Sequence, residues 1–492
     1  MNEQTKNPNT PPRNVKKLLP IILIILIPAL LLVLGLLFFN KNSGNESLGN
    51  NIDDSAINWS SYEEKSIELS DSLKITTPGV YTLSGSIENG LIEINTTGVV
   101  KLILNGVSIK NSSGPAILVS EAKTVIIETA EGSENFLEDG SVYSISDEDV
   151  CATLFSKDDL VLQGSGTLSV VGNYEDAIVS KDDLKISSGT YKIDAKDEGI
   201  RGRDSLYVKS GTFDISAGGD GLKANNSDEV AKGYVLIDGG TFDISADDDG
   251  IHAESSLEIN GGTINIKKSY EGLEGSKITI NGGDISVIAS DDGLNAAGGN
   301  DSSSPNMANY QSSSSNYSIN LNGGKIYVNS LGDGIDSNGA LYISGSEVVV
   351  DGPANSANGA LDAEGEVVYS GGSIIALGAS GMAVAPGSSS TKNSISVFFS
   401  QTSAAKTKLT VKDSSGTTLL EHTSTRSFGH AVLSSESFEQ GKTYTIFLND
   451  EEYTTVTISG TTTQSGQGGM MPGGGGGMAP GGQQGAPGGM RR

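Results

Sequence analysis

Short stretches in which apolar residues alternate with other residues run along most of the chain. Examples are Leu206–Val208, Phe213–Ile215 and Ile278–Ile280, in which the two outer residues are apolar. Residues two apart share one face of a β-strand, so each stretch predicts a strand that buries one face. The repeat region has no sustained 3.6-residue apolar spacing of the kind found in amphipathic helices. The pattern therefore predicts an all-β protein.

A second pattern recurs from residue 176 to 362, usually as an acidic residue, a small residue and then Ile or Leu. Its apolar positions are Ile178, Ile200, Leu222, Ile251, Leu273, Leu294, Ile335 and Leu361. Successive steps are 22, 22, 29, 22, 21, 41 and 26 residues, and the two longest contain polar insertions at 225–233 and 297–316. Without these insertions the period is about 22 residues per coil.

Each period holds three short strands and three corners, one of which carries pairs such as Asn260-Gly261 and Asn281-Gly282 that favour sharp turns. An antiparallel meander would not repeat the same corner at one fixed period. The repeat therefore predicts a parallel β-helix. We expect it to be right-handed because parallel crossover connections almost always are.

The chain divides into seven segments by composition and repeat quality. We predict a cytoplasmic N-terminus (1–17), a transmembrane anchor (18–39), a linker (40–59), N-terminal β-helix coils with a cap (60–150), β-helix repeats with an acidic corner (151–393), a C-terminal β cap (394–460) and a disordered Gly/Met/Pro-rich tail (461–492). End caps are expected because the terminal coils of a solenoid otherwise expose a strand edge.

Residues 18–39 form an uncharged apolar run that is long enough to cross a bilayer as one helix. Lys16 and Lys17 precede the run, so the positive-inside rule predicts a single-pass membrane protein with most of the chain extracellular. A cleaved signal peptide is the alternative, although no convincing small-residue cleavage site follows the run.

Charge excludes one class of partner. The 60 acidic residues outnumber the 32 basic ones and give a formal net charge of −28, which would repel nucleic acid. A polyanion would need a bridging cation to approach this surface. The single cysteine, Cys151, cannot form an internal disulfide and is interpreted as a small core residue.

The recurring acidic corner is the candidate metal site. Equivalent residues of adjacent coils lie about 4.8 Å apart in a β-helix, so the stacked carboxylates should repel one another by roughly 3 kcal/mol per pair unless a cation neutralises them. Calcium, a hard cation abundant outside cells, is the cofactor that we expect. The candidate ligands are Asp197, Glu198, Asp220, Asp248, Asp249, Glu271, Glu274, Asp291, Asp292, Asp333, Asp336 and Asp362. The alternative is that Asp-Gly pairs are simply good turns, since no EF-hand loop is present.

One outward-facing position changes in charge from coil to coil. It is basic or imidazole first and then acidic or amide, in the order Arg201, Lys223, His252, Glu274, Asn295, Asp336 and Asp362. The basic residues would pair with neighbouring acids, whereas the acidic ones would add metal ligands.

Residues 80–119, the string Glu134–Gly140 and the Gly/Met-rich tail together resemble a bacterial family of carbohydrate-binding-domain proteins from cellulolytic clostridia. The resemblance covers about residues 60–460. It implies a pectate-lyase-like β-helix with calcium sites that binds polygalacturonate and cellulose, without established lyase activity.

Three functional hypotheses follow. The first is a non-catalytic, calcium-dependent binder of plant cell-wall polysaccharide, polygalacturonate or cellulose, with Tyr207, Tyr327 and Tyr342 as the chief aromatic residues of the repeat. The second is a polysaccharide lyase in which Arg201 or Lys223 removes the proton that calcium acidifies. The third is a surface adhesin or spacer that calcium makes rigid.

Overall fold

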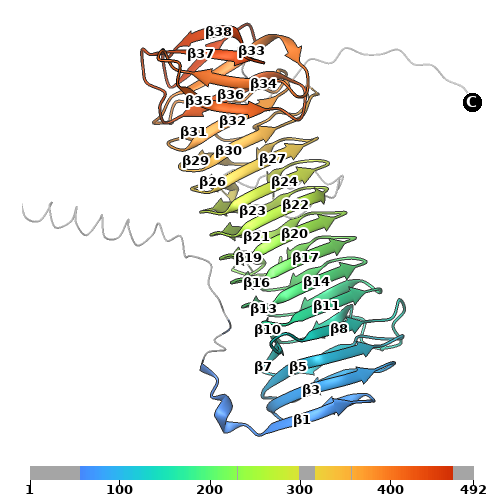
Figure 1. The fold of residues 1–492 in the computed structure, drawn as a ribbon. Coiled ribbons are helices and arrows are strands. Elements are labelled where there is room, and N and C mark those ends of the chain that lie inside the picture. The colour runs from blue at the N-terminus through green and yellow to red at the C-terminus, as the bar shows by residue number, and fades with distance from the viewer. Residues whose placement is uncertain (1–51, 53–55, 230, 298–315, 356, 469–492) are drawn as a thin grey trace, which may run out of the picture. The chain divides into compact units, whose positions relative to one another are not determined.

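The computed structural model describes residues 52, 56–229, 231–297, 316–355 and 357–468, and over these the chain forms a parallel β-helix closed by a β-rich cap (Figure 1). The predicted all-β class and parallel coils are confirmed, while the right-handed turn stays a prediction. Within the described ranges no helix is long and apolar enough to cross a membrane. The transmembrane segment predicted at 18–39 lies outside them.

Three parallel sheets run along the β-helix axis, and nearly every coil contributes a strand to each. Sheet 1 carries the acidic corner at the start of its strands. It consists of β2 (Leu73–Ile75), β4 (Ile92–Asn95), β6 (Ile117–Glu121), β9 (Ala152–Ser156), β12 (Asp176–Ser180), β15 (Ile200–Gly202), β18 (Leu222–Ala224), the first parts of β21 (Ile251–Ile259) and β23 (Leu273–Ile280), β25 (Leu294–Ala296) and β28 (Ile335–Ser337).

Sheet 2 follows sheet 1 in each coil, and sheet 3 follows after the Asn-Gly-Gly turn. Sheet 2 contains β7 (Thr124–Thr129), β10 (Asp159–Gly164), β13 (Asp183–Ile186), β16 (Ser205–Val208), β19 (Tyr234–Ile237), the second parts of β21 and β23, β26 (Ser318–Leu321), β29 (Ala340–Ile343) and β31 (Val367–Tyr369). Sheet 3 contains β8 (Glu134–Glu138), β11 (Thr167–Gly172), β14 (Thr190–Ala195), β17 (Thr212–Ala217), β20 (Thr241–Ala246), β22 (Thr263–Ser269), β24 (Asp284–Ala289), β27 (Lys325–Ser330), β30 (Glu347–Asp351) and β32 (Ser373–Gly378). The N-terminal strands β1 (Glu64–Leu69), β3 (Gly79–Ile87) and β5 (Val99–Lys110) are longer, and β5 pairs with both β7 and β8.

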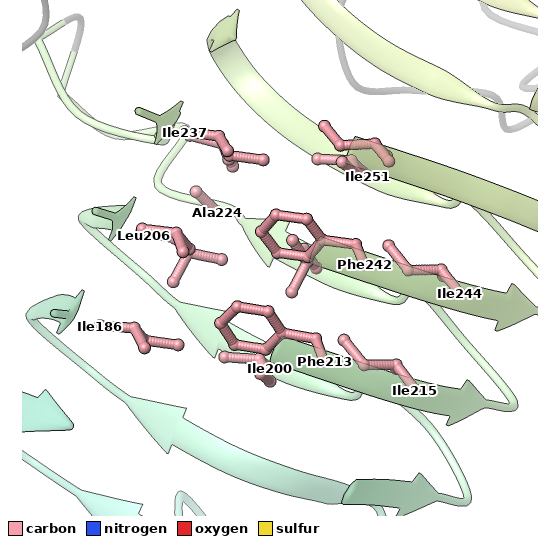
Figure 2. Packing of buried hydrophobic residues seen from close by; sticks show 14 of the residues in the cluster. Ile186, Ile200, Leu206, Phe213, Ile215, Ala224, Ile237, Phe242, Ile244 and Ile251 are labelled. Carbon is pink, nitrogen blue, oxygen red and sulfur yellow. The ribbon is translucent and has the colours of Figure 1, made fainter. Parts of the chain in front are cut away.

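The core is a stack of like residues, because each inward side chain contacts its equivalent in the next coil. Figure 2 shows Phe213 and Phe242 lying one above the other, with ring centroids 4.5 Å apart. Tyr191 stacks on Phe213 in the same way at 5.1 Å. Ile215 and Ile244 form a neighbouring pair in register. The strand faces predicted from the period of two are therefore the buried ones.

In six of the eight coils a glycine precedes the apolar residue of the acidic corner, whereas Ala177 and Ala360 hold this place in the first and last of them. The glycines are crowded by the next coil. A Cβ on Gly250 would lie 2.6 Å from the carbonyl oxygen of Gly272 and 2.6 Å from the side chain of Ile266. Gly221 and Gly272 are crowded in the same way by the next coil. The Asp-Gly pairs therefore do more than form turns, because close stacking leaves no room for a Cβ at these glycines.

The opposite corner is held by a ladder of side-chain amides. Asn281 Nδ2 donates to Asn260 Oδ1 at 2.7 Å, and Asn322 Nδ2 donates to Asn281 Oδ1 at 2.9 Å. The glycine two residues after each of these asparagines, such as Gly262 at φ 103°, adopts a left-handed conformation. The predicted Asn-Gly-Gly turn is confirmed at this corner.

Antiparallel strands follow the last coil and end the parallel stack. Strand β36 (Phe428–Ser435) pairs antiparallel with β32 of the last coil and with β33 (Ser394–Ser403). A separate antiparallel sheet contains β34 (Lys408–Lys412), β35 (Thr418–Thr423), β37 (Thr443–Leu448) and β38 (Glu451–Thr457).

The ordered chain extends beyond both predicted boundaries. Strand β39 (Thr462–Ser465) pairs with β33, so the start of the segment predicted as a disordered tail belongs to the cap. At the other end, Ile52 of the predicted linker is buried against Ile126 and Val161. Lys101 lies 4.8 Å from the ring centroid of Trp59. Apolar contact with the coils explains both differences, since neither segment carries the 22-residue repeat.

Candidate functional site

The acidic corner is a stack of carboxylates along the start of sheet 1. Its members are Asp176, Glu198, Asp220, Asp249, Glu271, Asp292 and Asp333. Most receive a backbone hydrogen bond from the equivalent residue of the next coil: the N–H of Asp249 donates to Asp220 Oδ1 at 2.9 Å, and that of Glu271 donates to Asp249 Oδ1 at 3.2 Å. This ladder fixes the carboxylates at the coil spacing, as the repeat predicted.

The outward position two residues after the corner glycine forms a second stack, which we call the outer column. Strand register aligns its seven residues in the predicted order: Arg201, Lys223, His252, Glu274, Asn295, Asp336 and Asp362. Towards the N-terminus the same column continues as Val179 and Phe155, which are buried in an apolar cluster with Cys151. From the N-terminal coils to the C-terminal coils, the side chains of the outer column are therefore first apolar, then cationic and then mostly acidic.

Arg201 and Lys223 form the cationic half of the outer column, and carboxylates of the protein neutralise both side chains. Lys223 Nζ lies 2.8 Å from Glu198 Oε1 and 2.7 Å from Asp220 Oδ2. Although burial opposes it, contact with these two carboxylates raises the pKa of Lys223 above its usual value. Arg201 forms an ion pair with the buried carboxylate of Asp176 and also lies 3.0 Å from the sulfur of Cys151. Both cations act as fixed counter-charges.

These contacts weaken the lyase hypothesis for this pair. A catalytic base must be uncharged when it accepts a proton. Lys223 and Arg201 are each held in the charged form by carboxylates beneath them, and their side chains are only 21% and 18% exposed. Burial also raises the pKa of the Cys151 thiol to about 12, which disfavours the thiolate form that would act as a nucleophile.

His252 sits where the cationic half ends. Its Nδ1 lies 3.2 Å from Asp249 Oδ2 and also contacts the carboxylate of Glu274 on the next coil. Burial alone would lower the pKa of His252, but the contacts with Asp249 and Glu274 raise it to about 11. Two buried carboxylates thus share one imidazole.

Two oxygens beyond His252 are buried without a partner. Glu274 Oε1 and Asn295 Oδ1 accept no hydrogen bond from any described residue. Asn295 instead uses its Nδ2 to donate to both oxygens of Glu271, at 2.9 and 2.8 Å. Burial raises the pKa of Glu274 to about 7. Oxygen atoms in this position are costly unless a donor or a cation meets them.

Further along, the side chains of Asp292, Asp333 and Asp336 converge. One oxygen of each lies within 4.8 Å of the others, and no Lys or Arg of the described chain forms an ion pair with them. Burial, reinforced by the neighbouring carboxylates, raises the pKa of Asp292 to about 8 and that of Asp336 to about 7. The pKa of Asp333 is raised to about 6, again chiefly by burial. A cation at this point would relieve the repulsion.

The remaining predicted metal ligands divide into two groups. Asp197 and Asp248 are exposed at the edge of the corner, each grouped with two acids of the cationic half. Asp291 and Asp362 are half-buried, and neither joins a group of three candidate ligands within the described residues.

Sequence reasoning missed two features near this surface. Tyr270, 42% exposed, lies between Asp248 and Asp291 in the stack, since its backbone bonds to both. Asp159, Asp182 and Asp183 form a separate acidic group at the corner between sheets 1 and 2. The repeated Lys-Asp-Asp-Leu string ending at Leu160 and Leu184 was the available signal for that group.

The β-helix is similar in sequence to known proteins. Residues 70–314 match the family described as carbohydrate-binding domain-containing protein. A relative with the same description from Acetivibrio thermocellus is 36% identical over 128 residues, which is 25% of this chain and 45% of that protein. The alignment therefore spans less than half of the relative's length.

One solved structure is also similar. It is described as the polysaccharide lyase-like protein from C. thermocellum, in a gadolinium derivative. The sequences are 33% identical, and the match covers 45% of this chain and 92% of that one, with a TM-score of 0.39.

Proposed function

We propose that this chain, whose residues 70–314 match the family of carbohydrate-binding domain-containing proteins, binds acidic plant cell-wall polysaccharide through calcium at the acidic half of its outer column. The residues that would hold the ion are Asp292, Asp333 and Asp336. The anchor predicted at residues 18–39 would keep the β-helix on the outer surface of the cell membrane.

One observation carries the proposal: the outer column changes from neutralised to uncompensated charge along a single stack. Lys223 offsets Glu198 and Asp220, whereas Asp292, Asp333 and Asp336 converge without a cationic side chain among the described residues. A repetitive fold that needed these acids only for turns would not leave three carboxylates facing one another at half-buried positions.

The residues present fit calcium. Calcium prefers six to eight oxygen ligands from carboxylates, amide groups and water, and tolerates irregular geometry. Carboxylates supply the set here, and the unpartnered Oδ1 of Asn295 lies in register between Glu274 and Asp336. When bound, the ion would neutralise the corner and accept oxygen atoms from a second polyanion.

The overall charge makes such a bridge necessary for a uronate ligand. A chain of net charge −28 and a polygalacturonate chain repel each other, so direct contact needs a shared cation. Tyr270 offers an exposed ring beside the same stack, on which a sugar can lie. Cellulose, which is uncharged, would depend on such stacking alone.

The proposal is tested with the full chain, purified in detergent, and immobilised polygalacturonate. We expect retention in the presence of calcium, loss of retention on addition of a chelator, and recovery when calcium is restored. Asp333→Asn should weaken calcium-dependent retention at least about tenfold. Asp197→Asn is the matched control, because that exposed carboxylate belongs to the half that Lys223 and Arg201 neutralise.

Each of the other outcomes contradicts a defined part of the proposal. Retention that survives the chelator would exclude the calcium bridge. New ultraviolet absorbance from unsaturated uronate ends would show lyase activity and exclude a purely binding role. Calcium binding without retention on any wall polysaccharide would leave the rigid surface spacer as the function.

A further inference from the structure

Asp249, His252 and Glu274 bring a nitrogen and two carboxylates together across two coils. Asp249 and His252 belong to the corner and first strand residues of one coil, and Glu274 pairs in register with His252 on the next. One ligand atom from each lies within 4.8 Å of the other two, and all three residues are buried. The set lies one step before the carboxylates to which we assign calcium.

Glu274 gives this set an unfilled oxygen. Its side chain is 1% exposed, and Oε1 has no hydrogen-bond partner in the described part of the chain. Its other oxygen meets His252 Nδ1, which Asp249 also approaches. Two buried carboxylates and one imidazole therefore face a common centre. Glu274 Oε1 is the one potential ligand atom of this set that contacts no donor in the described part of the chain.

The two preceding coils show how the fold satisfies this position when a long cation is available. Arg201 and Lys223 reach the corner carboxylates with flexible, permanently charged side chains. Histidine is shorter and can lose its proton, and the next residue in the column, Glu274, adds a negative charge. One imidazole here faces two buried carboxylates, so its single positive charge leaves one negative charge without a counter-charge.

We propose that Asp249, His252 Nδ1 and Glu274 form a binding site for a divalent transition metal of the zinc class. Mixed imidazole and carboxylate ligands suit zinc and its neighbours, whereas calcium selects oxygen alone. On binding, the proton on Nδ1 passes to solvent and the ring nitrogen donates its lone pair to the metal. The ion would join two coils at the point where the internal cations end, and the site does not depend on polysaccharide binding.

The full chain in detergent, freed of metal, is titrated with Zn²⁺ and Co²⁺ in the presence of excess calcium and without polysaccharide. We expect one equivalent of either metal to bind. The Co²⁺ form should show a strongly shifted, exchangeable imidazole N–H resonance, because Nε2 keeps its proton when Nδ1 binds the metal. This readout needs no variant, and the chain contains only three histidines to distinguish.

Variants then locate the site. His252→Gln and Glu274→Gln should each weaken Zn²⁺ binding at least about tenfold. His422→Gln is the matched control: His422 also contacts a buried carboxylate, that of Asp351, but lies in no group of three ligands in the described ranges. Binding that persists in His252→Gln, absence of the shifted imidazole resonance, or displacement of Zn²⁺ by calcium would each overturn the site, while leaving the polysaccharide proposal to its own retention test.

Discussion

Lys223 Nζ lies 2.7 Å from Asp220 Oδ2, and the carboxylate of Asp220 is almost completely buried beneath it. The pair belongs to one coil, and the same amine reaches Glu198 of the preceding coil. Lys223 therefore occupies, as part of the chain, the place that a bound cation would fill between stacked carboxylates.

Removing that amine should destabilise the β-helix. Lys223→Met keeps most of the aliphatic side chain but leaves Asp220 buried and unpaired, which we expect to cost about 3–5 kcal/mol in the free energy of unfolding. Chemical denaturation followed by circular dichroism measures the change. Lys209→Met, at an exposed position, should stay within about 0.5 kcal/mol of the native value. Equal effects of the two changes would show that the ion pair is not stabilising.

Gly250 should not tolerate even a methyl group. A Cβ at residue 250 meets the backbone of the next coil, so Gly250→Ala should destabilise the protein by about 1–3 kcal/mol. Gly239→Ala is the control, because its Cβ would find its nearest neighbour, the carbonyl oxygen of Lys209, at an ordinary 3.6 Å. Thermal unfolding distinguishes them. If Gly250→Ala melts like the native protein, close coil stacking does not explain the repeated glycine.

The pH dependence of stability should report the uncompensated carboxylates. In the metal-free protein the pKa of Asp336 is raised to about 7 by burial and by Asp333, from an ordinary value near 4. The folded state therefore holds this proton more tightly than the unfolded state. Its contribution to stability is fully present below about pH 4 and is lost as the pH rises through about 7.

Asp336→Asn removes that dependence. Relative to the variant, the native protein should lose on the order of 1 kcal/mol of stability between pH 5 and pH 9 in the presence of a chelator. If the proposed calcium site is present, added calcium should reverse the loss at high pH, since a cation would bind the charged form. Denaturant titrations of both proteins at several pH values measure the difference. Parallel curves for the two proteins would contradict the raised pKa.

Tyr270 should contribute to polysaccharide binding without affecting calcium. Tyr270→Ala removes an exposed ring beside the acidic corner, and we expect about fivefold weaker retention on polygalacturonate, equivalent to ~1 kcal/mol. Tyr342→Ala is matched in exposure, 43% against 42%, but lies on sheet 2. Calcium affinity should be unchanged in both variants. A similar loss in both, or in neither, would remove Tyr270 from the binding surface.

The geometry of the coil follows from the periodicity of the chain. Inward positions alternate at the strand period, and corner residues recur at the coil period, so stacks such as Phe213 on Phe242 and Lys223 beside Arg201 could be aligned from spacing alone. A short, regular period fixes which residues become neighbours, because each coil contacts only the coils before and after it.

How the stacked charges are neutralised depends on contacts between coils that the periodicity does not reveal. Whether a side chain reaches the acid beneath it depends on its length, rotamer and burial, which differ among Lys223, His252 and Glu274 although their backbone positions are equivalent. The ordered strand β39 and the buried Ile52 also escaped prediction, because they pack on the β-helix without repeating it. The period of the chain aligns the column, and the reach of side chains across the coils decides which carboxylates have an internal counter-charge.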